Sequence, residues 1–274
     1  MRRELRIIFL TDLDGTLLHF DDFNFAAART PILKYIDQGI DIIPVSSKTK
    51  PEIEQFCDDL GVHLPFIYEN GAGFSIPALS SADTQEIICG TTTAELIQIW
   101  NTAIPIELRA YCQLLMDMDT AECRSLLGLE GDALELALQR AYSVLLTFKG
   151  DKKTLTLLNI YCERAGLTLQ KGGRIFCLAG KHNKATFIET LRRDRRAKQP
   201  APCIIAFGDG NNDIPMLNAA DIACVIPRPN GVHLPPDSIT THIIIATQPA
   251  PIGWQQAAEM ALKKVSDTGE VNYG

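Results

Sequence analysis

Short apolar runs that end at acidic or hydroxyl-bearing residues recur near both ends of the chain. Residues 5–10 lead into Thr11 and Asp12, residues 40–45 lead into Ser46, and residues 203–207 lead into Gly208 and Asp209. Continuous runs of this length are typical of strands that are buried on both faces of a parallel sheet. The same pattern predicts further strands at residues 66–68, 222–226 and 239–246.

Segments with apolar residues at helical spacing lie between these runs. They predict helices at residues 26–38, 51–60, 184–191, 214–220 and 253–265. The helix 51–60 has Pro at its start and Gly61 after its end, the usual placement of both residues. Strands that alternate with helices form parallel sheets through right-handed crossovers. We therefore expect an α/β fold with a doubly wound, Rossmann-like parallel sheet, in which residues 66–68 form the third strand.

The middle of the chain lacks apolar runs that end at acidic loops. It predicts helices at residues 91–100, 120–127, 132–141 and 153–165, strands at 86–89 and 144–148, and a hairpin of residues 167–170 and 174–178. This mixture is typical of an α+β domain. We expect a core domain of residues 1–84 and 181–274, interrupted by an inserted α+β domain of residues 85–180.

The composition describes a globular protein that does not bind nucleic acid. The 274 residues include 26 basic and 33 acidic side chains, a formal charge of −7, whereas nucleic-acid binders usually have a basic balance. No apolar run approaches the ~20 residues that span a bilayer. The eight cysteines are scattered without a CxxC pair, which predicts reduced thiols and a cytoplasmic protein. We expect a monomer or weak homodimer that binds no membrane.

Two carboxylates, Asp12 and Asp14, directly follow the first predicted strand. Their spacing places both on one side of the chain, at the sheet edge where open parallel sheets bind ligands. Two acids this close raise each other's pKa unless a cation lies between them. An isolated pair of this kind is more often a solvated turn, so the function depends on what the other strands contribute.

Three further groups follow strands or begin helices of the predicted core. Ser46 and Ser47 lie at a strand-to-helix junction, where hydroxyl and backbone N–H groups form a seat for phosphate. Lys184 begins the helix after the inserted domain, and Asp209 and Asp213 flank Asn212 after another buried strand. This combination is much more specific than any one of its members.

Together these elements resemble the four motifs of the haloacid dehalogenase-like hydrolase superfamily. The motifs are Asp12-Leu13-Asp14-Gly15-Thr16, then Ser46, then Lys184, and finally Gly208-Asp209-Gly210-Asn211-Asn212-Asp213. The resemblance covers nearly the whole chain. Because the stretch between Asp14 and Ser46 is too short for a domain, the inserted domain follows Ser46, as does the large type-2 cap of sugar-phosphate phosphatases.

A second group of residues resembles those of the mannosyl-3-phosphoglycerate phosphatases, which make the compatible solute mannosylglycerate. The similar segments are Ser46-Ser47-Lys48-Thr49, Glu69-Asn70-Gly71, Gly172-Gly173-Arg174 and residues 120–148. The resemblance implies a phosphorylated sugar as substrate. It implies a substrate-binding set of Lys48, Glu69, Asn70, Arg140, Gly172, Gly173 and Arg174. Arg174 is the candidate for the glycerate carboxylate, since a guanidinium can bind a carboxylate through paired hydrogen bonds. Bracing of its loop is the alternative role for Glu69.

The resemblance also implies a mechanism. Asp12 is the nucleophile that forms an aspartyl-phosphate, and Asp14 is the general acid and base. Mg²⁺ is held by Asp12, the main-chain carbonyl of Asp14, and Asp209, while Asn212 and Asp213 support this site from behind. Ser46, Ser47 and Lys184 bind the phosphoryl oxygens.

Several other functions fit part of the same pattern. The substrate could instead be glucosyl-3-phosphoglycerate, sucrose phosphate or another sugar phosphate. A phosphosugar mutase is less favoured, because many such enzymes carry a cap between the first two motifs. A phospho-accepting receiver module or a sugar-phosphate-binding protein without turnover belongs to a different class; Asp14, the inserted domain and the reactive side chains in all four motifs argue against both.

Overall fold

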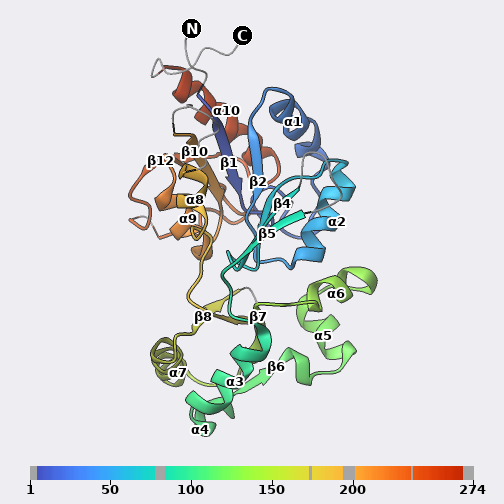
Figure 1. Cartoon of the computed structure of the whole chain (residues 1–274), viewed down its shortest axis with the longest axis vertical. Coiled ribbons are helices and arrows are strands. Elements are labelled where there is room, and N and C mark those ends of the chain that lie inside the picture. The colour runs from blue at the N-terminus through green and yellow to red at the C-terminus, as the bar shows by residue number, and fades with distance from the viewer. Residues whose placement is uncertain (1–4, 78–83, 173–174, 194–200, 236, 268–274) are drawn as a thin grey trace.

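A computed structural model gives the architecture of the chain. The structure describes residues 5–77, 84–172, 175–193, 201–235 and 237–267. Two bodies lie one above the other in Figure 1, and two segments of the chain connect them. The body that contains the larger sheet is called the core below, and the body that contains α3 to α7 is called the cap.

A five-stranded parallel sheet forms the centre of the core. Its strands are β1 (Ile7–Thr11), β2 (Asp41–Pro44), β10 (Cys203–Gly208), β11 (Ile222–Val225) and β12 (His242–Ile245). Their order is β12-β11-β10-β1-β2, and every neighbouring pair is parallel. The chain leaves β1 towards β2 and later returns on its other side at β10, so the direction of winding reverses between β1 and β10. Open sheets bind ligands at such a reversal.

Alternate residues of each central strand enter two different apolar layers. Phe9 and Phe207 pack with Trp254 in one layer, together with the helices α1 (Ala26–Asp37), α2 (Lys50–Leu60) and α10 (Ile252–Asp267). Ile8 and Leu10 face the opposite layer, which includes α8 (Ile188–Arg193) and α9 (Ile214–Ala219). Helices therefore cover both faces of the sheet, and the predicted doubly wound α/β fold is confirmed.

Residues 66–68 meet the parallel sheet at a single parallel bridge and otherwise belong to another sheet, so their predicted position as its third strand is confirmed only in part. They form β3 (Phe66–Tyr68), which pairs with β4 (Gly73–Pro77), and β4 pairs with β5 (Thr84–Ile88) in a separate antiparallel sheet. The chain reverses at Glu69, Asn70 and Gly71, which have φ values of 45°, 57° and 99°. This tight reversal returns the chain beside β3, and an isolated parallel bridge from Val45 to Ile67 connects β3 to the end of β2.

The cap is built on a four-stranded antiparallel sheet. Its strands lie in the order β6-β7-β9-β8, with the bounds β6 (Cys112–Leu114), β7 (Ser143–Phe148), β8 (Thr168–Lys171) and β9 (Phe176–Ala179). Its helices are α3 (Thr93–Ala103), α4 (Ile106–Arg109), the 3-10 turn η1 (Leu115–Asp117), α5 (Thr120–Leu127), α6 (Gly131–Leu138) and α7 (Lys152–Arg164). Leu96, Leu146 and Leu158 are fully buried and join α3, β7 and α7 in one apolar cluster.

The position of the boundary between core and cap remains a proposal. The pairing of β5 places this boundary later in the chain than the sequence predicts. The expected boundary at residues 84 and 85 falls inside β5, yet β5 pairs with β4 and Ile87 packs against the second layer of the core. We therefore propose that the cap begins near Gly90, whose N–H donates to the Ala72 carbonyl at 2.9 Å. The first cap helix follows at once, because Thr92 and Glu95 form the capping box that starts α3.

Candidate active site

Neighbouring strands of the parallel sheet place their following residues at one edge. Asp12 follows β1, Ser46 lies just beyond β2, Asp209 follows β10, and Arg228 lies just beyond β11. Thr11 is opposite both Phe207 and Pro44 in the register, so the strands end level with one another. The ordinary geometry of a parallel sheet therefore gathers residues that are far apart in the sequence.

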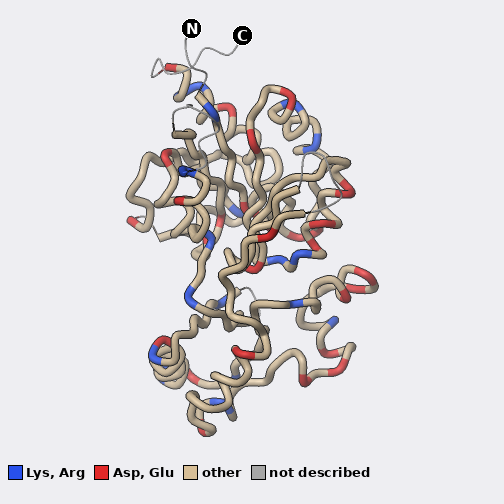
Figure 2. The backbone as a smooth tube through the Cα atoms, in the orientation of Figure 1, with Lys and Arg blue, Asp and Glu red and all other residues tan. Residues whose placement is uncertain are grey.

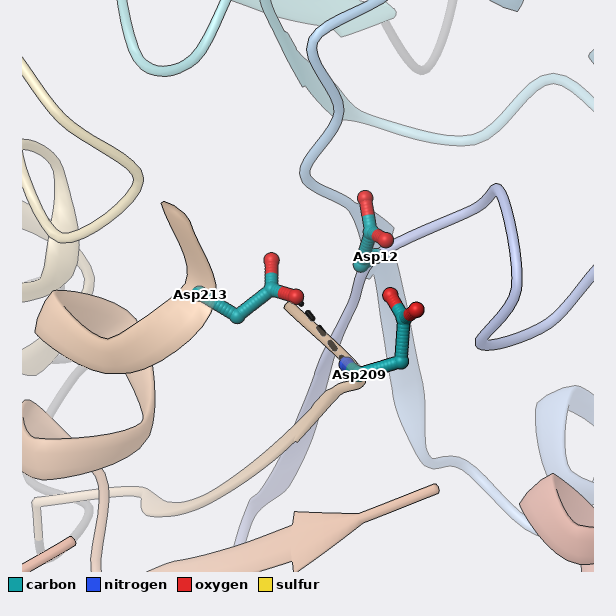
Figure 3. A group of neighbouring side chains, drawn as sticks. All are labelled: Asp12, Asp209 and Asp213. Atoms are coloured by element: carbon teal, nitrogen blue, oxygen red, sulfur yellow. Dashed lines mark hydrogen bonds between the residues drawn. The ribbon is translucent and has the colours of Figure 1, made fainter. Parts of the chain in front are cut away.

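Three buried carboxylates meet at this edge. Oxygens of Asp12, Asp209 and Asp213 lie within 4.8 Å of one another. Figure 3 shows the carboxylates of Asp12 and Asp209 side by side, with Asp213 approaching from the following turn, η2 (Asn211–Asp213). Asp213 Oδ2 accepts hydrogen bonds from the backbone N–H groups of Asp209 at 3.0 Å and Gly210 at 2.9 Å. Asp213 therefore fixes the loop that carries Asp209.

Lys184 lies between two of these carboxylates. Its Nζ is 2.5 Å from Asp12 Oδ1 and 2.6 Å from Asp213 Oδ1, and the residue is 1% exposed. Burial alone would lower the pKa of Lys184, but Asp12 and Asp213 raise it above its ordinary value. The lysine is therefore a fixed positive charge next to Asp12. The helix predicted from Lys184 begins later, at Ile188, because residues 184–187 form turns.

The carboxylates still have an excess of negative charge. Burial, and then the neighbouring Asp213, raise the pKa of Asp12 well above its ordinary value, although Lys184 opposes this. Burial and Asp213 likewise raise the pKa of Asp209. A divalent cation would remove this repulsion, and carboxylate oxygens are ligands that Mg²⁺ prefers. Asp12 and Asp209 each keep one oxygen that no described cationic side chain contacts, whereas Lys184 and two backbone N–H groups occupy both oxygens of Asp213. The donor set of Asp12 and Asp209 therefore fits the predicted metal.

Asp14 lies beside the carboxylate group and is not part of it. Its side chain is 35% exposed, and Oδ2 is 3.1 Å from Lys48 Nζ. The other oxygen, Oδ1, is buried and accepts no hydrogen bond from the described residues. Burial raises the pKa of Asp14, against the opposing charge of Lys48. Its environment therefore favours a carboxyl group that can hold a proton.

The segment after β2 forms the next wall of the site. Ser46 is buried, its Oγ accepts the Lys48 N–H at 3.2 Å, and its carbonyl accepts the Asn70 N–H at 2.8 Å. Ser47 and Lys48 line the adjoining cleft with Asn70. Asn70 Oδ1 also accepts a hydrogen bond from the Asn212 side chain at 3.3 Å. The predicted residues Ser46, Ser47, Lys48, Asn70 and Asn212 are thus brought together.

Glu69 and Arg140 connect the core to the cap. The Glu69 carboxylate accepts hydrogen bonds from the Ala141 and Tyr142 N–H groups at 2.9 and 3.0 Å and from Ser143 Oγ at 2.5 Å. Arg140 donates to the Ser47 carbonyl at 3.2 Å. These contacts place Glu69 where it can brace the loop between core and cap. Arg140 lines the cleft and also contacts the loop that carries the predicted phosphate-binding residues.

A cleft of about 350 Å³ separates core and cap beside these residues. Asp12, Asp14 and Asp209 line its core side, and Arg140 and Gly172 line its cap side. The volume lies within the range of small-molecule sites. The other two members of the predicted Gly-Gly-Arg turn, Gly173 and Arg174, lie outside the described residues, so their assignment stays a prediction.

Sequence reasoning missed Arg228 and the aromatic residues Phe20 and Phe23, which also line the cleft. Arg228 Nε is 2.5 Å from Asp209 Oδ2, and its guanidinium lies 5.0 Å from the centre of the Phe20 ring. Lys48 lies 4.8 Å from the centre of the Phe23 ring. A signal for Arg228 was present, because this cation closely follows a predicted strand that ends at the same sheet edge.

The fold and the site together define a class of protein. A parallel sheet presents carboxylates and a buried lysine at its carboxyl edge, beneath a cap that encloses a cleft. This is the arrangement of an α/β enzyme suited to the transfer of a phosphoryl group. Acidic and basic residues are mixed along the described parts of core and cap, as Figure 2 shows.

Known proteins match nearly the whole chain. The family described as haloacid dehalogenase-like hydrolase matches residues 9–91 and 134–228. A glucosyl-3-phosphoglycerate/mannosyl-3-phosphoglycerate phosphatase from Methanococcoides burtonii is 30% identical, over 92% of this chain and 96% of its own. A protein of the same description from Persephonella marina is 30% identical, over 94% of this chain and 98% of its own.

Solved structures agree with the fold. A haloalkanoate-superfamily phosphatase from Bacteroides thetaiotaomicron superposes with a TM-score of 0.60 at 18% identity, and the match covers 97% of this chain and 96% of that one. The chain belongs to the haloacid dehalogenase-like hydrolases, and the resemblance predicted from its motifs is confirmed. Within the described residues, no helix is both long and apolar enough to cross a membrane.

Proposed function

We propose that this protein is a Mg²⁺-dependent phosphomonoester hydrolase that removes phosphate from a glycosyl-3-phosphoglycerate. Mannosyl-3-phosphoglycerate is the first candidate, with mannosylglycerate as product, and the glucosyl compound is the second. The observation that carries the proposal is the buried Lys184 Nζ between Asp12 and Asp213, directly behind Asp12, which lines a capped cleft. The two relatives described as glucosyl-3-phosphoglycerate/mannosyl-3-phosphoglycerate phosphatases, which match nearly all of this chain, support the substrate class.

Asp12 carries out the first step. One of its carboxylate oxygens attacks the phosphorus, the bond between phosphorus and the ester oxygen breaks, and an aspartyl-phosphate forms. The departing alkoxide takes a proton from Asp14, whose raised pKa favours the protonated form. Lys184, together with the hydroxyl and backbone N–H groups around Ser46 and Ser47, stabilises the charge on the phosphoryl oxygens.

Asp14 also serves the second step. Its carboxylate takes a proton from a water molecule, and the water oxygen attacks the phosphorus of the aspartyl-phosphate. The bond between phosphorus and Asp12 breaks, which restores the Asp12 carboxylate and releases inorganic phosphate. Lys48, 3.1 Å from Asp14, keeps this second carboxylate oriented towards the cleft.

A divalent cation would be held by Asp12, Asp209 and the main-chain carbonyl of Asp14. When bound, it supplies positive charge that reduces the repulsion between the Asp12 carboxylate and the phosphate dianion. Asp213 positions the Asp209 loop through its two backbone hydrogen bonds. Phosphate monoesters need rate accelerations up to about 10²¹, which is consistent with several charges that converge on one group.

The cap supplies specificity in this proposal. Gly172, Lys171 and Arg140 line the cap side of the cleft and face the acidic floor across it. A glycosyl-3-phosphoglycerate has a carboxylate in addition to its phosphate, so it needs a second cation beyond Lys184. Asn70 and Lys48 are placed to contact the substrate from the core side.

Release of inorganic phosphate from a panel of esters tests the proposal. The panel contains mannosyl- and glucosyl-3-phosphoglycerate, sucrose 6-phosphate, hexose 6-phosphates and free 3-phosphoglycerate, each with Mg²⁺. We expect one glycosyl-3-phosphoglycerate to exceed the hexose phosphates in kcat/KM by orders of magnitude. Asp12→Asn should abolish turnover, while Asp58→Asn, at an exposed position on α2, should leave it unchanged.

Other outcomes separate the alternatives. If hexose phosphates are the best substrates, the hydrolase proposal stands and the glycerate assignment fails. If Asp12→Asn retains turnover, the nucleophile assignment is wrong. If the wild type accumulates a stable phosphoryl group on Asp12, or binds sugar phosphates without releasing phosphate, the receiver or binding-protein alternative replaces the hydrolase.

A further inference from the structure

Arg228 forms an ion pair with a residue proposed as a metal ligand. Its Nε is 2.5 Å from Asp209 Oδ2, and the side chain of Asp209 is 4% exposed. The guanidinium also lies over the Phe20 ring, 5.0 Å from its centre. A guanidinium cannot lose its proton in a protein, so this is a permanent positive charge at the edge of the carboxylate group.

The two oxygens of Asp209 have different neighbours. Oδ1 lies 3.3 Å from the Thr16 hydroxyl, which is also 3.4 Å from Asp12 Oδ2. Oδ2 is occupied by Arg228. A cation shared by Asp12 and Asp209 would therefore draw on the same carboxylate that Arg228 neutralises, and the two positive charges would repel each other at close range.

The other two carboxylates, those of Asp12 and Asp213, are paired with Lys184. Lys184 binds both Asp12 and Asp213 and is 1% exposed, so it has little freedom to move. Arg228 is different, because its side chain is 29% exposed and lines the cleft. Among the described cations that contact the carboxylate group, Arg228 is the one with room to leave.

The backbone at Arg228 allows such a movement of the side chain alone. The N–H of Arg228 donates to the Gly231 carbonyl at 3.0 Å, and the N–H of Gly231 donates to the Arg228 carbonyl at 2.9 Å. This turn holds the Cα in place. Rotation of the side chain about its own bonds would carry the guanidinium from Asp209 into the cleft.

We propose that Arg228 neutralises Asp209 in the metal-free protein and gives it up when a divalent cation binds, so that Arg228 sets the metal affinity of the site. This inference rests on the proposed metal-dependent function. In the metal-bound state the released guanidinium faces the cleft, where an anionic substrate enters. Arg228 is thus a positioning residue for the metal, because it acts through Asp209.

Isothermal titration of the full-length protein with Mg²⁺, without substrate, tests the proposal. Arg228→Met removes the competing charge and should bind Mg²⁺ about tenfold more tightly than the wild type, which corresponds to about 1.4 kcal/mol. In EDTA the variant should unfold at a lower temperature than the wild type, because Asp209 has lost its partner. Added Mg²⁺ should raise its unfolding temperature by more than that of the wild type.

Two matched variants separate the ion pair from a general effect of charge. Lys171→Met removes a positive charge from the cap side of the same cleft, and Arg192→Met removes one from an ion pair with Asp221 outside it. Both should leave Mg²⁺ affinity within about twofold of the wild type, since neither cation touches Asp209.

Three results would overturn the inference. They are an unchanged or weaker Mg²⁺ affinity in Arg228→Met, an equal gain in Lys171→Met, and an unchanged unfolding temperature of Arg228→Met in EDTA. In each case Mg²⁺ binding by the wild type keeps the proposed hydrolase intact. If the wild type itself binds no Mg²⁺, the metal-dependent function fails with the inference.

Discussion

Glu69→Gln is expected to loosen the joint between core and cap. Glu69 is 2% exposed, and its carboxylate accepts hydrogen bonds from two backbone N–H groups and one hydroxyl at the start of β7. Glutamine has nearly the same shape, but one of its terminal atoms donates hydrogen bonds and cannot accept them. The substitution therefore tests the hydrogen bonds with little change in packing.

The magnitude follows from which bonds survive. If the amide oxygen takes the place of Oε2, the bonds from Tyr142 and Ser143 remain, and the amide nitrogen faces the Ala141 N–H. The Ala141 N–H, in an exposed residue, then lacks its protein acceptor, which costs about 1–2 kcal/mol, the lower part of the range for a buried donor. The two surviving bonds lose the assistance of the negative charge, which is worth roughly 0.5–1 kcal/mol each. The total is about 2–4 kcal/mol.

Thermal unfolding and kinetics together measure this effect. A loss of this size should lower the unfolding temperature by about 3–7 °C for a protein of this length. Glu189→Gln is the matched control, because Glu189 forms an exposed pair with Arg193 at 3.9 Å and its loss should be nearly neutral. Hydrolysis of a small aryl phosphate, which does not need the cap, should change less than hydrolysis of the preferred sugar substrate.

The opposite pattern would refute the bracing role. If Glu69 instead binds a sugar hydroxyl, Glu69→Gln should raise KM for the sugar substrate while its unfolding temperature stays within about 1 °C of that of the wild type. A variant that unfolds as the wild type does, and differs only in KM, would return Glu69 to the substrate-binding set predicted from the sequence.

Gly71→Ala and His182→Gln probe the same junction, and Gly128→Ala, within the cap, is the control for the first. Gly71→Ala would place a methyl group 2.0 Å from the Asn183 carbonyl oxygen at a φ of 99°, so it should destabilise the fold by about 3 kcal/mol or more. Gly128→Ala, with a φ of 68° and open space around it, should cost only about 1 kcal/mol, and denaturant unfolding of both variants checks the difference. Burial lowers the pKa of His182, so the folded protein binds fewer protons than the unfolded chain. The wild type should therefore lose stability as the pH falls through about 6.5, and His182→Gln should lose less between about pH 7.5 and pH 5.5, as unfolding at both pH values would show. A variant whose pH dependence equals that of the wild type would contradict the burial of a neutral histidine.

The sequence was most informative where local pattern and sheet geometry determine position. Apolar runs identified the strands of the parallel sheet to within a few residues, because its central strands β1, β10 and β11 are almost wholly buried and therefore consist mainly of apolar residues. Once those strands are parallel, the residues after them must meet at one edge. For this reason Asp12, Ser46 and Asp209 could be expected to converge, although up to about two hundred residues separate them.

Local pattern could not decide the partner of residues 66–68. Three apolar residues are compatible with a parallel or an antiparallel neighbour. The outcome depended on the reversal at Glu69 and Asn70, two residues with positive φ that are not glycine. Such a conformation costs energy in isolation, and here hydrogen bonds from this loop to Ser46 and Lys48, just beyond β2, and its contacts with the cap hold it.

The role of each charged residue depends on its distance from other side chains in the fold, and the spacing of residues along the sequence does not reveal this distance. The resemblance to a family directed attention to Arg140 and Arg174, and Arg228 was overlooked. What distinguishes Arg228 is that β11 lies next to β10, which brings the guanidinium to Asp209. The adjacent strands thus bring Asp209, which the sequence predicted, into contact with Arg228, which it did not. A motif alone does not identify the residues that neighbour it in space, whereas the order of the strands does. Any cation just beyond a strand next to β10 is therefore a candidate partner for the carboxylates.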